Sequence, residues 1–78
     1  MRKKQLCMIL TFSTTTEAMA MESYATAHNL PGRLIPVPTV IHAGCGACWK
    51  APIAEKADIL LAVENAQLSY EGIFELVI

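Results

Sequence analysis

The order of short apolar segments along the chain is the feature that most constrains its fold. Several runs of apolar residues are too short for typical helices, and their length is typical of buried strands. Two longer stretches between them carry apolar residues at helical spacing. The expected order is strand, helix, strand, strand, helix, strand. The expected strands are 6–12, 33–38, 47–50 and 72–78.

The first helix has clear start and stop signals. Thr14 offers a hydroxyl group as N-cap, and Glu17 lies at capping-box distance from it. The helix should end at about His28, because Asn29 tolerates the left-handed conformation and Pro31 prevents the helix from resuming.

Two prolines constrain the middle of the chain. Pro36 has no N–H to donate to a ladder, so its strand should lie at a sheet edge or bend away there. Ala51 and Pro52 should lead into the second helix, since proline is tolerated in the first turn. Helical spacing then continues to about Ala66.

This element order predicts a ferredoxin-like split βαβ motif, an α+β fold over one domain, residues 1–78. A four-stranded antiparallel sheet would carry both helices on one face and leave the other face bare. The expected strands are apolar at nearly every position, and only 17% of all residues are charged, against about 25% in ordinary soluble domains. We therefore expect a homo-oligomer that packs through the open sheet face.

Charge and length exclude several classes of partner. The net charge is −1 and no basic stripe is present, which argues against nucleic acid and against an anionic membrane surface. No run reaches the ~20 apolar residues of a membrane-spanning helix.

The first twenty residues imitate a secretory leader. Basic residues 2–4 precede the apolar run 6–12, and Ala18 and Ala20 imitate a cleavage site. The apolar run has only the minimum length, and cleavage would remove a whole expected strand. Three cysteines are also too few and too odd in number for a secreted disulfide framework. We expect a cytoplasmic protein in a reducing compartment.

Cys45 and Cys48 form a CxxC pair, and we expect these two residues to carry the reactive thiols of the functional site. One thiol of such a pair can stabilise or resolve the other, and the two can form a reversible disulfide. Gly44 and Gly46 flank Cys45 and would let backbone approach closely on either side. Cys7, in contrast, is expected to be a small core residue.

The expected fold brings Cys45 near the start of the first helix. In a split βαβ motif the turn between the second and third strands lies at the same end of the sheet as that helix start. Free N–H groups, the hydroxyls of Thr14 and its neighbours, and the helix dipole favour an anion there. The alternative is that these hydroxyls only cap the helix.

His42 extends the pair to an H-x2-C-x2-C pattern, which leaves a metal site as an alternative. Its ligands would be His42, Cys45 and Cys48, and a closed tetrahedral zinc site would need a fourth. Cys7 is a poor candidate, because the strand that it begins places it about 16–20 Å from the loop. We therefore expect neither a metal nor another cofactor, and interpret His42 as a solvated loop residue or a local proton acceptor in the substrate site.

The stretch from Pro36 through Pro38 to Cys45 and Gly46, together with the flanking elements, resembles the Se/S carrier-like family of small bacterial domains. The likeness covers nearly the whole chain. It implies a carrier rather than a turnover enzyme, in which the cysteine that matches Cys45 holds sulfur or selenium as a persulfide-type adduct. It also implies donor and acceptor proteins as partners.

Two residues depart from the family pattern. Thr39 stands where the family usually has a basic residue, so an expected anion contact is missing. Cys48 replaces a small or apolar residue and would add a resolving thiol, which leaves a dithiol redox protein open. Two alternatives of other classes also stay open: a noncatalytic binding or regulatory module whose cysteines are incidental, and the metal-binding loop.

Overall fold

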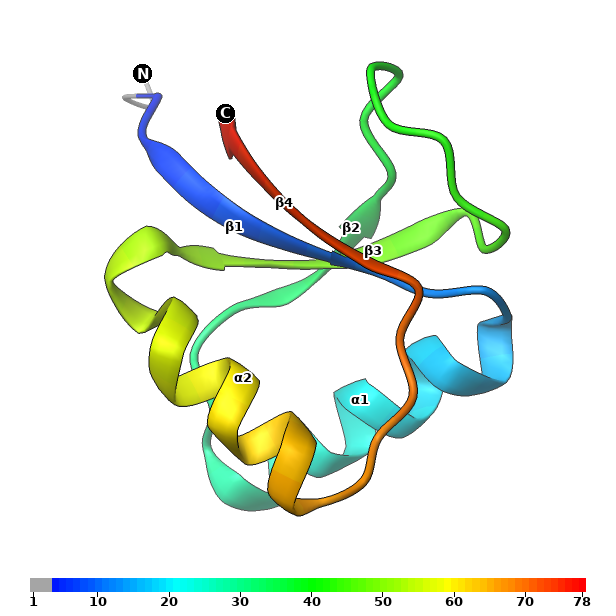
Figure 1. The fold of residues 1–78 in the computed structure, drawn as a ribbon, viewed down its shortest axis with the longest axis vertical. Helices are drawn as coiled ribbons and strands as arrows, with labels where there is room; N and C mark the ends of the chain where they lie inside the picture. The colour runs from blue at the N-terminus through cyan, green and yellow to red at the C-terminus, as the bar shows by residue number, and fades with distance from the viewer. Residues whose placement is uncertain (1–3) are drawn as a thin grey trace.

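The computed structural model describes residues 4–78, and basic positions 2 and 3 lie outside that range. Four strands and two α-helices follow one another in the order β-α-β-β-α-β, with one turn of 3-10 helix (η1) before the second α-helix (Figure 1). Residues 6–11 of the apolar run 6–12 form the first strand, and Ala18 and Ala20 lie inside the first helix. The elements are β1 Leu6–Thr11, α1 Thr15–His28, β2 Arg33–Pro36, β3 Ala47–Pro52, η1 Ile53–Glu55, α2 Lys56–Asn65 and β4 Gly72–Val77.

The sheet has the strand order β2-β3-β1-β4, and every neighbouring pair is antiparallel. Both helices lie on one side of it (Figure 1). The predicted ferredoxin-like α+β fold is confirmed. Between residues 4 and 78, none of the helices combines the length and the apolar character needed to cross a bilayer.

Both ends of α1 are formed as predicted. The Thr14 hydroxyl accepts a hydrogen bond from the Glu17 N–H at 3.2 Å, and the Glu17 carboxylate accepts one from the Ser13 N–H at 2.8 Å. At the other end Asn29 has a left-handed φ of 55°, and its N–H donates to the carbonyl of Ala25. These contacts satisfy backbone groups that a helix end leaves free.

The prediction for Pro52 is wrong, whereas the prediction for Pro36 is confirmed. Ala51 and Pro52 continue β3, where they pair with Met8 and Cys7 of β1. The chain therefore turns later, through η1, and α2 begins only at Lys56. Pro36 ends β2, which is an edge strand and needs no donor on its outer side.

The main core lies between the sheet and the helices. The register of β1 with β3 puts Met8 beside Ala51 and Leu10 beside Trp49, and all four side chains are buried. Trp49 fills this core, and its indole N–H donates to the carbonyl of Pro31 at 3.1 Å. The remaining buried members of this cluster are Phe12, Ala18, Met21, Ala25, Cys45, Ile59 and Val63.

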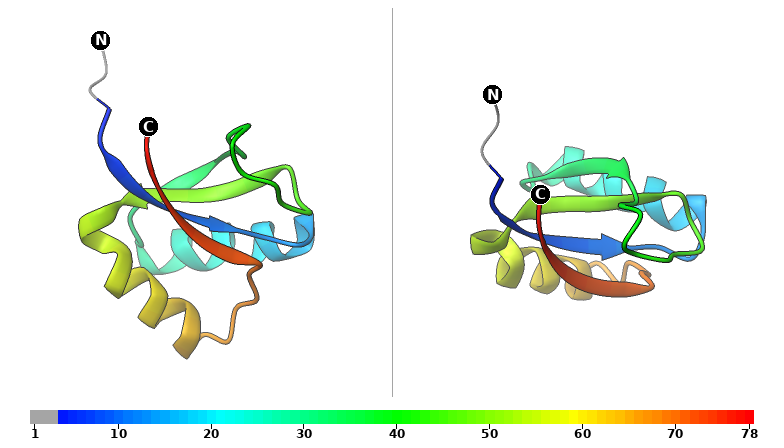
Figure 2. Two further views of the ribbon diagram at one scale, coloured as in Figure 1. Left: turned by 45° about the horizontal axis from the view of Figure 1, so that its top comes forward. Right: turned by 90° about the horizontal axis from the view of Figure 1, so that it is seen from above.

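The sequence suggested that the second face of the sheet is bare. This prediction is wrong, because the loop between β2 and β3 covers part of that face. This loop, residues 37–46, rises on the side away from the helices (Figures 1 and 2). Its Ile41 is 7% exposed and packs with Ile9 and Cys48 in a second apolar cluster. Phe74 on β4 remains 40% exposed. Association of two copies through the rest of this face stays a prediction.

Gly32 provides a test of the packing between β2 and β3. Its φ is +107°, and a Cβ there would lie 2.5 Å from both the Lys50 carbonyl oxygen and the Trp49 indole nitrogen. Gly32→Ala should lower the free energy of unfolding by about 2–4 kcal/mol, because it adds backbone strain to overpacking. Chemical denaturation measures this change. Gly46→Ala is the matched control, since a Cβ at position 46 meets nothing within 4 Å; equal losses in the two variants would contradict this account.

Candidate functional site

Cys45 lies at the start of α1, as the split βαβ topology predicts. Its backbone N–H donates to the carbonyl oxygen of Phe12 at 3.0 Å. Phe12 follows β1 directly and precedes the residues that cap α1. This hydrogen bond therefore joins the end of the β2–β3 loop to the turn where β1 passes into the helix.

Two polar groups approach the sulfur of Cys45. The thiol donates to the Thr15 hydroxyl oxygen at 3.9 Å, and the Ala47 N–H donates to Sγ at 3.5 Å. The residue is only 6% exposed and belongs to the core cluster on the helix side of the sheet. An N–H directed at sulfur stabilises negative charge on it, and so does the N-terminal end of a helix.

The two glycines that flank Cys45 have different surroundings. A Cβ on Gly44 would lie 2.6 Å from the carbonyl oxygen of Ser13, so the loop passes this close to the helix start only with glycine at position 44. A Cβ on Gly46 would meet nothing within 4 Å. The expected close approach is therefore confirmed for Gly44 and is wrong for Gly46, which instead leaves open space on its side of Cys45.

The structure brings Thr15, rather than Thr14, to the sulfur. The Thr14 hydroxyl is used as the helix cap for the Glu17 N–H, as the alternative interpretation of the sequence held. Thr15 is the next residue, and its hydroxyl is the one within reach of Cys45. The sequence pointed to this run of hydroxyl residues, but only the geometry of the helix start selects one of them.

Cys48 lies in different surroundings from Cys45. It is fully buried in the second apolar cluster, with Ile9 and Ile41, on the opposite face of the sheet from the helices. Burial and, to a smaller extent, the nearby Cys45 together raise the pKa of the Cys48 thiol to about 11. Both cysteines are free thiols. The pair is thus close in sequence but divided between two clusters.

His42 does not join the cysteines. It is an exposed residue of the same loop. Within residues 4–78 no three His, Cys, Asp or Glu side chains are grouped so that they could hold a metal ion. The geometry of the described residues therefore gives the metal-binding alternative no support.

Glu71 is a residue of this site that sequence reasoning missed. Its carboxylate accepts a hydrogen bond from the Gly44 N–H at 3.1 Å, and its own N–H donates to the carbonyl of Thr11 at 2.6 Å. It thereby ties the loop before Cys45 to the start of β4. An exposed acidic residue before a strand carries no local signal for this contact, because the contact spans 27 positions of the sequence.

Comparison with known proteins agrees with the resemblance noted in the sequence. The model of one family, described as "Putative Se/S carrier protein-like", matches residues 7–75. The matched range includes Pro36, Pro38, Cys45 and Gly46. No curated protein and no solved structure matches the chain.

The raised pKa of Cys48 makes stability depend on alkaline pH. The folded state holds this proton up to about pH 11, whereas the thiol of an unfolded chain loses it near pH 9.0. The unfolded state then binds fewer protons, so the free energy of unfolding should fall as pH rises from about 9 to 11. Denaturant titrations across this range measure the slope. Cys48→Ala should flatten it; a slope equal to that of the native protein would contradict the assignment.

Proposed function

This chain belongs to the Se/S carrier-like family, and we propose that it carries sulfur or selenium as a persulfide-type adduct on Cys45. The observation that supports this role most directly is the setting of the Cys45 sulfur. An N–H from Ala47 and the hydroxyl of Thr15 lie beside it at the start of α1. Such donors suit a sulfur atom that must bear negative charge when it attacks a donor and again when it leaves as a thiolate on unloading.

Loading would be a displacement between sulfur atoms. The Cys45 thiolate attacks the outer sulfur of a persulfide on a donor protein. The donor's sulfur–sulfur bond breaks, its cysteine leaves as a thiolate, and a new sulfur–sulfur bond forms on Cys45. An acceptor thiolate reverses these steps and regenerates Cys45. Selenium would move in the same way if it replaces the outer sulfur, and neither step needs an external oxidant or a cofactor.

The start of α1 provides groups for the outer atom of the adduct. In the first turn the Glu17 N–H is taken by the Thr14 hydroxyl, and the Ala18 N–H by the Thr14 carbonyl. The earlier N–H groups of a helix have no partner inside it and are available to an anion. Partner proteins would approach from the side of Gly46, where the surroundings of the backbone are open.

Cys48 enters this proposal as a second thiol that acts only after a local opening. It pairs with Thr11 and Ile35 on the two neighbouring strands and lies in the second cluster. A disulfide with Cys45 therefore requires this end of β3 to separate from its neighbours. Transfer to a separate acceptor protein needs no such movement, which favours a carrier over a dithiol redox protein.

Sulfur loading tests the proposed role directly. Reduced protein treated with inorganic polysulfide should gain the mass of one sulfur atom, and reductant should remove it. Cys45→Ser should lose this gain, whereas Cys48→Ser and Cys7→Ser should keep it. Intact mass and peptide mass spectrometry measure the adduct and its position. Loading that survives Cys45→Ser, or an unreactive Cys45, would sink the carrier and favour the noncatalytic binding module.

Thr15 should affect the lifetime of the adduct rather than its formation site. Thr15→Val removes the hydroxyl beside Sγ and keeps the side-chain shape. Cys45 must leave as a thiolate when excess thiol takes the outer sulfur, so the loaded variant should release that sulfur about 2–10 times more slowly, the effect of one hydrogen bond. Time-resolved mass spectrometry follows the loss. Thr16→Val is the matched control, because Thr16 is exposed in the same turn. Equal lifetimes in the two variants would remove Thr15 from the proposed site.

A further inference from the structure

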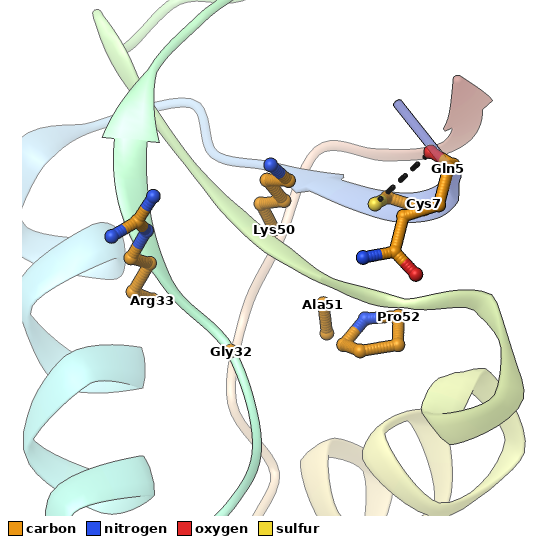
Figure 3. A pocket seen from close by; sticks show the side chains of 7 residues that line it. All are labelled: Gln5, Cys7, Gly32, Arg33, Lys50, Ala51 and Pro52. Atoms are coloured by element: carbon orange, nitrogen blue, oxygen red, sulfur yellow. Dashed lines mark hydrogen bonds between the residues drawn. The ribbon is translucent and has the colours of Figure 1, made fainter. Parts of the chain in front are cut away.

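A pocket of about 230 Å³ lies at the end of the sheet away from Cys45. Its lining comes from the chain before β1 and from the adjoining ends of β1, β2 and β3 (Figure 3). Arg33 and Lys50 lie on one side of it, and Gln5 lies across from them. In the β2–β3 register Arg33 pairs with Lys50, whereas Ala47, next to the Cys45 loop, pairs with Pro36 at the other end. The pocket is therefore separate from the candidate carrier site.

Two cations face this pocket without a neutralising acid. Arg33 and Lys50 are register partners on adjacent strands, so their side chains project from the same face of the sheet. Among residues 4–78 the ion pair present joins Lys56 and Glu75, and neither Arg33 nor Lys50 has a carboxylate partner. Like charges directly opposite each other destabilise a sheet. An anion bound between them would remove this repulsion.

The rest of the pocket is uncharged. Cys7 is 2% exposed, and its thiol donates to the backbone carbonyl of Gln5 at 3.4 Å. The ring of Pro52 adds apolar surface, whereas Ala51 borders the pocket with its side chain buried in the core on the helix side. The side-chain amide of Gln5 offers one donor and one acceptor (Figure 3). The lining thus combines two positive charges and an amide with a small apolar wall.

We propose that this pocket binds a small organic dianion, such as a short dicarboxylate or a phosphate ester. Two cations match two negative charges, and the planar guanidinium of Arg33 can hold a carboxylate or a phosphate through two parallel hydrogen bonds. Pockets for drug-sized ligands span about 300–1,000 Å³, so this smaller one suits a body of only a few carbon atoms. The wall of Cys7 and Pro52 would contact that body.

Backbone NMR titration of the whole protein tests the binding. Succinate and inorganic phosphate are the two probes, and neutral succinamide is the control ligand. A dianion should produce saturable shifts at the amides of Cys7, Gly32 and Lys50, and leave those of Cys45 and Gly46 unmoved. Added salt should weaken the binding. Saturation by one probe and not the other supports the site and identifies the headgroup.

Charge-neutral variants assign the effect to the two cations. Lys50→Gln and Arg33→Gln should each weaken binding about tenfold, the usual size of one charge-assisted contact. Lys56→Gln is the matched control, since it removes one positive charge from α2 on the helix side of the sheet. Lys50→Gln should fold at least as stably as the native chain because it relieves the like-charge pair, so a loss of binding is not a loss of fold.

Three results would overturn the proposal: shifts that do not saturate, binding of succinamide as tight as that of succinate, or equal weakening in Lys56→Gln and Lys50→Gln. None of these results bears on sulfur loading at Cys45, and a failure of loading leaves the pocket titration unchanged. The two proposals can therefore fail separately.

Discussion

β1 is the strand on which the rest of the molecule depends, because it is one of the two central strands of the sheet and leads directly into α1. β3 and β4 both hydrogen-bond to it, and its residues Met8 to Thr11 are at most 1% exposed. One face of β1 contributes to the core under the helices, and the other contributes Ile9 to the cluster under the loop. The end of this strand then leads directly into the start of α1. The most rigidly held part of the sheet therefore positions the helix terminus beside Cys45.

The backbone of the Cys45 loop is held at that terminus by contacts from two other parts of the chain, the turn after β1 and the residue before β4. Phe12 accepts the Cys45 N–H, Ser13 lies against Gly44, and Glu71 accepts the Gly44 N–H. Ile41 anchors the same loop on the second face of the sheet. These contacts fix the position of Cys45 at the helix start. The loop is thus part of the packing and of the candidate site at once.

The sheet separates two kinds of chemistry. At one end Cys45 lies among neutral donors at a helix start, and at the other end Arg33 and Lys50 border a pocket. The same separation applies across the sheet, where Cys45 packs on the helix side and Cys48 on the loop side. Because side chains alternate between the two faces along a strand, two cysteines that are close in sequence can lie in different surroundings.

The sequence alone determined the order of the elements, both ends of α1, the edge position of Pro36 and the approach of Cys45 to the helix start. These features depend on local patterns and on the topology of one common motif, which short-range rules describe well. Only the tertiary structure decided that β3 continues through Pro52, that the loop covers part of the second face, that Thr15 rather than Thr14 meets the sulfur, and that Glu71 holds the loop. Each of these depends on pairing or packing between segments far apart in the chain, and no local pattern encodes such contacts.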